Sequence, residues 1–339
     1  MPEKIKVVVT RQLIPEAQKL LESEPNLEII QWHNENPCDR NWLLTNAPNS
    51  TGILLTLSDK VDTELLETAG PTLKVISSFS VGTDHIETSA VKHRNIRLGY
   101  TPTILTDAVA DLAVMLILMA QRRGGEGIRN VLDGRWPQMP WSPALMTGPQ
   151  IGGSVVGFLG FGRIAQATVK RLVPFGVEKV VYLTSRPGER AREDYFGLLR
   201  DQPVSIEPAG SWEEVARESD IVVVACSLSE STKHLVGTEF LGMMKKEAVV
   251  VNIARGPVVD TDALMKALDE ERIFGAGLDV IEGEPNITAD HPILRQKRCV
   301  LVPHIGSATF NTRMGMAMES VRNLLAVLRG EEMVNECVL

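Results

Sequence analysis

Three charged or titratable side chains occupy positions typical of catalytic residues, because each follows a strand-like run of apolar residues. They are Arg255, Glu284 and His304, all in the last third of the chain. The carboxyl ends of parallel strands form the edge at which open α/β sheets bind ligands. We therefore expect these three side chains to lie close together at one edge of a sheet.

With a hydride donor, the three residues together could catalyse the reduction of a ketone. Adding a hydride to a carbonyl carbon builds negative charge on the oxygen, which requires a proton donor and an electropositive clamp. His304 beside the carboxylate of Glu284 would be the donor, since a nearby carboxylate favours the imidazolium. Arg255 could bind a substrate carboxylate through two parallel hydrogen bonds. Taken singly, such a histidine is more often a structural hydrogen-bonding group and such an arginine a cap or ion pair, so the hypothesis depends on all three.

A glycine-rich turn precedes this group in the chain. Gly160, Phe161, Gly162, Arg163 and Ile164 follow the apolar run 154–159 and open a helical pattern. In a dinucleotide site the first glycine makes the tight turn, and the second lets the backbone approach a pyrophosphate at the free N–H groups of the helix. A simple glycine turn is the alternative, but strand, helix and the following βαβ pattern all fall in place.

The next strand-like run ends at Ser185 and Arg186, where an NAD-specific site usually has an acidic residue for the ribose 2′-hydroxyl. A carboxylate would repel a 2′-phosphate, whereas a guanidinium binds it with charge-assisted hydrogen bonds. Arg190 lies nearby. The sequence thus predicts a preference for NADPH, with NADH as the second cofactor, unless Arg186 is an ordinary solvated residue.

The elements that must position these residues form two α/β series. Short β-rich runs alternate with helical patterns at residues 15–23, 62–69, 212–218 and 260–268. The first series has strand-like runs at residues 6–10, 27–30, 52–56, 74–77 and 96–98, and the second at 154–159, 179–183, 221–225, 248–252, 275–279 and 299–302. Near-continuous apolar strands separated by helices are typical of parallel sheets covered on both faces. The second series predicts a six-stranded dinucleotide-binding sheet.

Two segments could carry the chain between the halves, residues 99–102 and the region after His304. The apolar stripe of residues 309–328 has helical spacing and is read as core packing. Two crossings leave a cleft between domains, where small-ligand sites are common.

Composition excludes several other classes. The 339 residues carry a net charge of −8 without a long basic run, which disfavours nucleic acid and anionic membranes as partners. The cysteines are scattered without metal-ligand spacing, which predicts reduced thiols and no metal site. The chain starts directly with a strand, and its most apolar helix, residues 108–120, is too short to span a bilayer. We expect a cytoplasmic protein.

Several motifs in the same order resemble the D-isomer-specific 2-hydroxyacid dehydrogenase family. They cover essentially the whole chain and comprise residues 157–164, 252–256, 277–280 with 284–285, and 303–307. Within the family, residues 57–62, 80–85, 99–102, 105–107, 224–228 and 304–309 resemble the eukaryotic glyoxylate/hydroxypyruvate reductases.

The resemblance implies an α/β fold with two doubly wound parallel-sheet domains and a cleft between them. Residues 1–103 plus 305–339 would form a flavodoxin-like substrate-binding domain, and residues 104–304 a Rossmann cofactor domain through which the chain forms a homodimer. The activity implied is NADPH-dependent reduction of a small 2-oxo acid, glyoxylate or hydroxypyruvate, to the D-2-hydroxy acid by hydride transfer.

The resemblance also implies roles for individual residues. Arg255 would bind and polarise the substrate, His304 would act as acid and base, and Glu284 would orient it. The implied substrate contacts are Leu57, Ser58, Val81, Gly82, Arg255 and His304. The implied cofactor contacts are Thr106, Gly160, Phe161, Gly162, Arg163, Ile164, Ser185, Arg186, Cys226, Ser227, Thr232, Ile253, Ala254, Asp279 and Gly306.

Two alternatives stay open at this point. One is a dehydrogenase for a bulkier 2-oxo acid, for which Leu57 and the segment 136–141 would set the pocket size. In that segment Trp141 does not sit at the spacing expected for these reductases. Two roles for it therefore stay open: closing the partner subunit's pocket, or simple interface packing. The other is a non-catalytic, nucleotide-sensing protein of the corepressor type, which can keep the glycine turn and all three polar residues.

Overall fold

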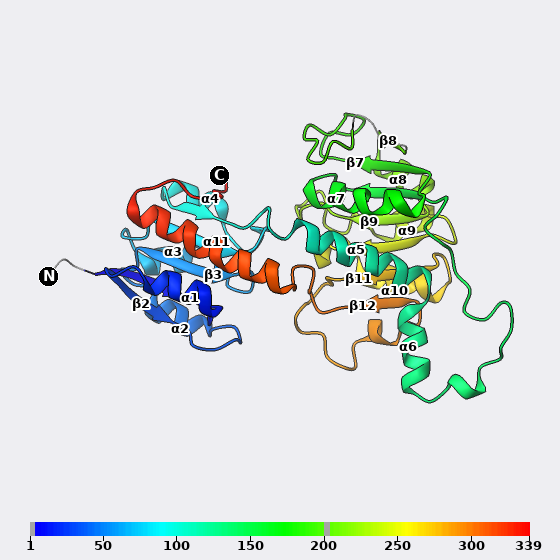
Figure 1. Cartoon of the computed structure of the whole chain (residues 1–339), viewed down its shortest axis with the longest axis horizontal. Coiled ribbons are helices and arrows are strands. Elements are labelled where there is room, and N and C mark those ends of the chain that lie inside the picture. The colour runs from blue at the N-terminus through cyan, green and yellow to red at the C-terminus, as the bar shows by residue number, and fades with distance from the viewer. Residues whose placement is uncertain (1–3, 200–203) are drawn as a thin grey trace. The chain divides into compact units, whose positions relative to one another are not determined.

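The computed structural model describes residues 4–199 and 204–339 and divides into two compact units. The first unit combines the chain up to Leu105 with Ser307–Leu339, and the second is Thr106–Gly306 (Figure 1). The sequence placed the divisions after residues 103 and 304, two positions earlier in each case. The later first division follows from helix α5, which begins at Thr106 and belongs wholly to the second unit.

The first unit is built on a parallel five-stranded sheet of order β2-β1-β3-β4-β5. Its strands are β1 (Ile5–Val9), β2 (Leu27–Gln31), β3 (Gly52–Thr56), β4 (Val75–Phe79) and β5 (Arg97–Gly99). The chain steps from β1 outward to β2 and then back across β1 to β3, so the strand order reverses between β1 and β3. This order is that of flavodoxin-like sheets.

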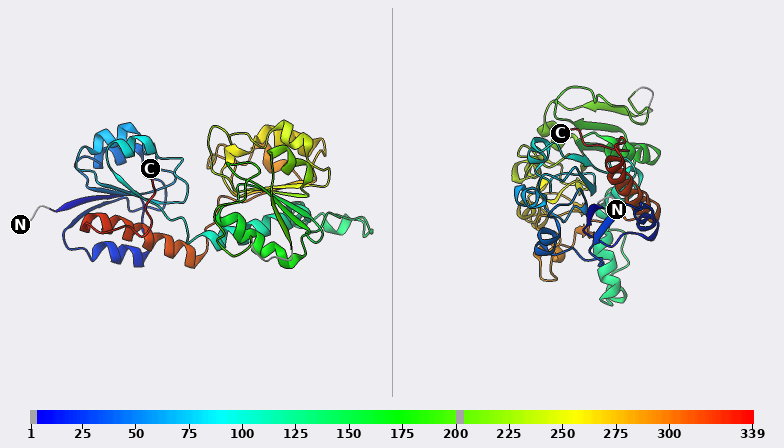
Figure 2. Two further views of the ribbon diagram at one scale, coloured as in Figure 1. Left: turned by 90° about the horizontal axis from the view of Figure 1, so that it is seen from above. Right: turned by 90° about the vertical axis from the view of Figure 1, so that its left-hand side faces the viewer.

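Helices cover both faces of this sheet, as Figure 2 shows. They are α1 (Pro15–Glu22), α2 (Arg40–Asn46), α3 (Thr63–Ala69), α4 (Thr88–His93) and α11 (Phe310–Arg329). Because side chains alternate along a strand, Val7 and Val9 pack with α1 and α11 while Val8 packs with α2, α3 and α4. The C-terminal helix thereby completes the core of the N-terminal sheet.

The second unit is built on a parallel seven-stranded sheet of order β12-β11-β10-β9-β6-β7-β8. Its strands are β6 (Val155–Leu159), β7 (Lys179–Leu183), β8 (Ser205–Pro208), β9 (Ile221–Val224), β10 (Val249–Asn252), β11 (Gly275–Leu278) and β12 (Cys299–Leu301). The expectation of six strands was wrong by one, since β8 adds an edge strand beside β7. The strand order reverses between β6 and β9, as in dinucleotide-binding sheets.

The helices of the second unit also cover both faces of its sheet. They are α5 (Thr106–Gln121), α6 (Gly124–Leu132), α7 (Arg163–Leu172), α8 (Trp212–Glu218), α9 (Thr238–Met243) and α10 (Thr261–Asp269), with short 3₁₀ turns at Trp136–Gln138, Val173–Phe175, Gly256–Val258 and Pro292–Arg295. In Figure 2, α5 and α7 lie on one face and α9 and α10 on the other. Among the described residues, no helix combines the length and the apolar character needed to cross a bilayer.

Candidate active site

The imidazole of His304 is hydrogen-bonded to the carboxylate of Glu284. His304 Nδ1 lies 2.9 Å from Glu284 Oε1, and both side chains are about 30% exposed, at 30% and 28%. The other oxygen of Glu284 accepts from the backbone N–H of Ile281 at 3.1 Å. One carboxylate oxygen is thus fixed to the loop after β11 and the other to the imidazole. With Nδ1 held in this way, Nε2 is the nitrogen that can serve a substrate.

The backbone around His304 is held by Asp279, the residue directly after β11. The carboxylate of Asp279 accepts from the N–H groups of Ile305 at 2.7 Å and Gly306 at 3.0 Å. The carbonyl of Asp279 accepts from the N–H of His304 at 2.9 Å. His304 has a φ of +51°, a left-handed conformation that a side chain rarely adopts without such support.

Asp279 is almost fully buried, and burial raises the pKa of its carboxyl group; the Glu284 charge adds to the rise, while the two backbone N–H groups and His304 oppose it. Both carboxylate oxygens are taken up by the protein backbone. The resemblance placed Asp279 among the cofactor contacts, and the structure shows its carboxylate bound to the turn that carries His304.

Arg255 follows β10, the strand next to β11. Buried Asn252 shapes this turn, donating through Nδ2 to the carbonyl of Arg255 at 2.9 Å and accepting from the N–H of Ala254 at 3.0 Å. A Cβ on Gly256 would lie 2.1 Å from the carbonyl carbon of Ile281, so the turn packs directly on the loop that holds Glu284. Arg255, Glu284 and His304 therefore follow three adjacent strands, β10, β11 and β12.

A pocket of about 730 Å³ opens at the carboxyl ends of β6, β7 and β9. This volume falls in the range of small-molecule and cofactor sites. Its lining includes eight of the expected cofactor residues: Gly160, Phe161, Gly162, Ser185, Arg186, Cys226, Ser227 and Thr232. The pocket lies where the strand order reverses, the position at which such sheets bind nucleotides.

The two glycines of the turn have different surroundings. Gly160 has a φ of +90°, and a Cβ there would lie 2.7 Å from backbone atoms of Cys226. Gly162 has a φ of −81°, and a Cβ there would meet no described atom within 4 Å. Gly162 also precedes α7 without a side-chain hydrogen bond capping that helix. An open backbone surface next to uncapped helix N–H groups fits the pyrophosphate of a dinucleotide.

The part of the pocket lining that follows β7 is rich in arginine. Arg186, Arg190 and Arg192 line it together with Glu193, and Arg186 pairs with Glu189 at 3.7 Å. Arg192 was not singled out from the sequence. Burial raises the pKa of the Cys226 thiol to about 11, so this side chain adds no negative charge to the pocket at neutral pH.

Residue Tyr195 also lines the pocket, and it too was missed from the sequence. The guanidinium of Arg163, at the start of α7, lies 4.1 Å from the centre of the Tyr195 ring. The segment is tied to α7 by Gln166, which donates to the carbonyl of Glu193 at 2.7 Å and accepts from the N–H of Tyr195 at 2.9 Å. No periodic pattern in the sequence signals such a contact.

The remaining expected cofactor residues do not line this pocket. They are Thr106, Arg163, Ile164, Ile253, Ala254, Asp279 and Gly306. Thr106 is 5% exposed, and within residues 4–199 and 204–339 its Oγ1 has no hydrogen-bond partner. A buried hydroxyl of this kind is suited to a ligand.

The expected substrate contacts in the first unit follow the neighbouring strands β3 and β4. Leu57 and Ser58 come directly after β3, and both are exposed. Val81 and Gly82 come shortly after β4. All four thus belong to the carboxyl edge of the five-stranded sheet.

Comparison with known proteins identifies the family. The model described as "D-isomer specific 2-hydroxyacid dehydrogenase, NAD binding domain" matches residues 114–306, which contain the pocket and the turns of Arg255, Glu284 and His304. The chain belongs to this family. This 2-hydroxyacid dehydrogenase homologue is 42% identical to the glyoxylate reductase/hydroxypyruvate reductase of Mus musculus over 99% of its own length and 98% of that protein.

Solved structures agree with this family assignment. A protein from Thermus thermophilus has a TM-score of 0.84 and 37% identity, with 98% of this chain and 100% of that chain covered. The NADPH-dependent glyoxylate/hydroxypyruvate reductase of Sinorhizobium meliloti, solved with NADP and malonate, has a TM-score of 0.79 and 27% identity, with 99% and 97% covered. This family member is an oxidoreductase with an NAD-binding Rossmann-type unit, as the sequence predicted.

Proposed function

We propose that this 2-hydroxyacid dehydrogenase reduces glyoxylate or hydroxypyruvate to the D-2-hydroxy acid with NADPH as the preferred cofactor. The observation that carries the proposal is the His304–Glu284 pair, held at the edge of the sheet that also bears the nucleotide-sized pocket. The mouse relative, 42% identical over nearly the full chain, is named a reductase of these two acids.

The residues have distinct tasks in this reaction. The substrate carboxylate docks on the guanidinium of Arg255, which also polarises the carbonyl. His304 donates a proton from Nε2 to the carbonyl oxygen as negative charge develops there. Glu284 accepts the Nδ1–H bond, keeps the ring oriented and stabilises its positive charge. Bound NADPH would supply the hydride.

The preference for NADPH rests on the charges of the pocket. Three guanidinium groups, those of Arg186, Arg190 and Arg192, line the region after β7, where an NAD-specific site carries an acidic residue. Glu193 is the carboxylate among the lining residues, so the positive charges are in excess. Such a cluster favours a 2′-phosphate over a bare hydroxyl. NADH remains the weaker cofactor.

A homodimer through the second unit is part of the proposal. Helix α6 and the turn after it expose Ile128 (54%), Leu132 (79%), Trp136 (63%) and Trp141 (94%) to solvent. Clustered exposed apolar side chains of this size mark interaction surfaces in soluble proteins. Most of the surface of both tryptophan side chains is exposed in the single chain. This suits either packing in a dimer interface or a contribution to the partner subunit's pocket.

Initial rates of NADPH oxidation test the activity. Glyoxylate and hydroxypyruvate should be turned over faster than a bulky branched or aromatic 2-oxo acid. His304→Ala should lower kcat by about two or more orders of magnitude, while the Kd for NADPH stays nearly unchanged. Full activity of His304→Ala would end the proposed mechanism. Faster turnover of the bulky acid would replace the substrate class, and no turnover of any 2-oxo acid would favour a nucleotide-sensing protein.

A further inference from the structure

A buried glutamine of the second unit holds a segment that lines the pocket. Gln166 lies on α7 and is 0% exposed. Its Nε2 donates to the carbonyl of Glu193 at 2.7 Å and to that of Phe161 at 3.2 Å, and its Oε1 accepts from the N–H of Tyr195 at 2.9 Å. Only this orientation of the amide directs its N–H groups at carbonyls and its oxygen at an N–H. Because a buried amide costs free energy unless it is hydrogen-bonded, these bonds hold the backbone around Glu193 in a defined place on α7.

A buried tyrosine of β7 holds the same segment from its other side. Tyr182 is 0% exposed, and its hydroxyl accepts from the N–H of Ala191 at 2.9 Å. Its ring stacks on that of Phe161, with 3.9 Å between the ring centres and 13° between the planes. Phe161 stands between the two glycines of the turn that borders the pocket. The backbone is therefore held at residues 191, 193 and 195, and all of these bonds lead back to the glycine turn and α7.

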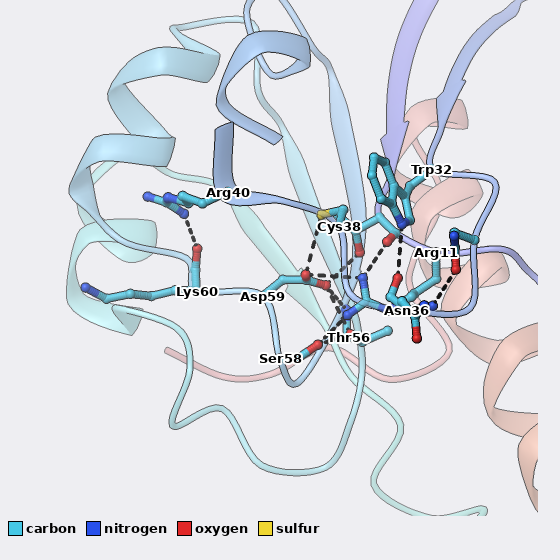
Figure 3. Close-up of polar contacts among 11 residues, drawn as sticks. Arg11, Trp32, Asn36, Cys38, Arg40, Thr56, Ser58, Asp59 and Lys60 are labelled. Atoms are coloured by element: carbon cyan, nitrogen blue, oxygen red, sulfur yellow. Dashed lines mark hydrogen bonds and ion pairs between the residues drawn. The ribbon is translucent and has the colours of Figure 1, made fainter. Parts of the chain in front are cut away.

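The backbone held in this way carries two arginines that border the pocket. Arg192 lies between two of the held residues and Arg190 directly precedes the first, and both line the pocket. The described residues give neither guanidinium an ion pair. By contrast, the buried Arg11 of the first unit has the carboxylate of Asp59 at 3.5 Å (Figure 3). Two arginines that border a pocket without such a carboxylate among these residues leave their charge for an anionic ligand.

The position of the backbone matters because an arginine side chain is long and has many rotamers. Ordering such a side chain when a ligand binds costs free energy, and a backbone that is already in place reduces this cost. Hydrogen bonds also weaken steeply when donor and acceptor move out of alignment, so a shift of the backbone weakens the arginine contacts. The 2′-phosphate is the group that distinguishes NADPH from NADH. Contacts that hold the two arginines in place should therefore strengthen the binding of one cofactor and not of the other.

We propose that Gln166 and Tyr182 are positioning residues that set the selectivity for NADPH over NADH, because they hold Arg190 and Arg192 where these bind the 2′-phosphate. The inference rests on the proposed function, which names NADPH as the preferred cofactor. Neither Gln166 nor Tyr182 lines the pocket, so both act through the backbone of residues 191–195. The 2-oxo acid takes no part in this selectivity, which should therefore be visible in cofactor binding alone.

Fluorescence titration of the Kd for NADPH and for NADH tests this without turnover. Tyr182→Phe keeps the ring stack and removes only the hydroxyl that holds Ala191. It should raise the Kd for NADPH about fivefold and leave the Kd for NADH within about twofold of the parent. Gln166→Leu removes all the hydrogen bonds of the amide, including the one to the glycine turn. It should raise the Kd for NADPH about 20-fold and the Kd for NADH less than about threefold.

A double-mutant cycle connects the effect to the arginines. The variant with both Arg190→Ser and Arg192→Ser should itself lose most of the selectivity, because the charges that bind the 2′-phosphate are gone. Adding Tyr182→Phe to this variant should change the Kd for NADPH less than about twofold, since no guanidinium is left to position. A full fivefold loss in this background would show that Tyr182 acts through the stability of the fold alone, and would contradict the proposal.

Thr168→Val is the matched control. Thr168 is a fully buried residue of the same helix, and its Oγ1 donates to the carbonyl of Ile164 at 2.9 Å. The substitution thus also removes a buried hydrogen bond from α7, but one that does not lead to residues 191–195. Both Kd values should stay within about twofold of those of the parent.

Other results would also overturn the inference. They are equal rises in the Kd for both cofactors, unchanged selectivity in Tyr182→Phe, or the same selective loss in Thr168→Val. If Gln166→Leu does not fold, Tyr182→Phe carries the test by itself, because it deletes a single oxygen. A parent that binds NADPH no more tightly than NADH would overturn the cofactor preference in the proposed function. A selective parent whose variants keep its selectivity removes only the role of Gln166 and Tyr182.

Discussion

The two glycines of the phosphate turn should respond in opposite ways to the same substitution. At Gly160, alanine must adopt a φ of +90° with its Cβ 2.7 Å from backbone atoms of Cys226. Left-handed backbone costs a residue with a Cβ about 1–2 kcal/mol, and overpacking adds about 1–3 kcal/mol. A domain of this size loses about 2–4 °C in Tm per kcal/mol. The two costs together come to about 2–5 kcal/mol, so Gly160→Ala should lower Tm by roughly 4–20 °C.

At Gly162 the backbone already suits alanine. With φ at −81° and no described atom within 4 Å of the new Cβ, the free protein should gain about 0.4–1 kcal/mol from the stiffer unfolded chain. The added methyl group instead occupies space that a pyrophosphate needs. A steric penalty of about 1–3 kcal/mol raises the Kd for NADPH about five- to 150-fold.

Thermal unfolding without ligand and fluorescence titration with NADPH measure the two effects separately. Gly242→Ala, an exposed position of α9 where a Cβ also meets nothing within 4 Å, is the matched control and should leave the Kd unchanged. The reasoning is refuted if Gly162→Ala binds NADPH within about twofold of the parent. It is also refuted if Gly160→Ala unfolds at the parent's Tm, because the tight turn would then not need a glycine.

Three further predictions concern charge, pH and assembly. Arg186→Ser should raise KM for NADPH about tenfold and leave KM for NADH nearly unchanged. The Arg186 guanidinium is half-exposed, so its hydrogen bond to a 2′-phosphate should contribute a free energy at the low end of the range for charge-assisted bonds. An equal loss with both cofactors in initial-rate assays contradicts this. Burial raises the pKa of Glu319 above the 4.5 of an unperturbed glutamate, so its contribution to stability is complete below that pH and is lost as the pH rises through the folded pKa. Glu319→Gln, which can still accept from Asn335, should therefore raise Tm by about 2–4 °C at pH 7 and by nothing at about pH 4, and a pH-independent difference in thermal unfolding would be inconsistent with it. Leu132→Glu should convert the proposed homodimer to a monomer in light scattering, and a mass equal to the parent's would contradict an interface at this residue.

Apolar runs in the sequence predicted the strands of both sheets except β8, because most of these strands are largely buried. Strands β9 and β10 are buried at every position, and such runs stand out against any helical pattern. Strand β8 was missed because Ser205–Pro208 is an edge strand with alternating exposed positions and a terminal proline. Strand β8 is held beside β7 by backbone pairing with that strand, and the sequence of residues 205–208 alone does not indicate this pairing.

The candidate site divides in the same way. Residues whose role follows from a turn or a strand end, such as Gly160, Gly162 and His304, could be proposed from spacing alone. Tyr195 and Arg192 could not, because their segment reaches the pocket through side-chain bonds to Gln166 and, at Ala191, to the hydroxyl of Tyr182. Long-range contacts of single side chains leave no repeating signal in a sequence.

The structure also decides which of two carboxylates serves His304. Asp279 and Glu284 both follow β11, and sequence position alone does not separate their tasks. Asp279 is nearly inaccessible, and its two oxygens accept from the N–H groups of Ile305 and Gly306, so it fixes the backbone that carries His304. Glu284 is partly exposed; one of its oxygens accepts from the N–H of Ile281 in its own loop, and the other is hydrogen-bonded to Nδ1 of His304. When the imidazole of His304 gains or loses a proton, the net charge of the His304–Glu284 pair changes. Water that still reaches Glu284 can stabilise the pair in either state, which a buried carboxylate would not allow.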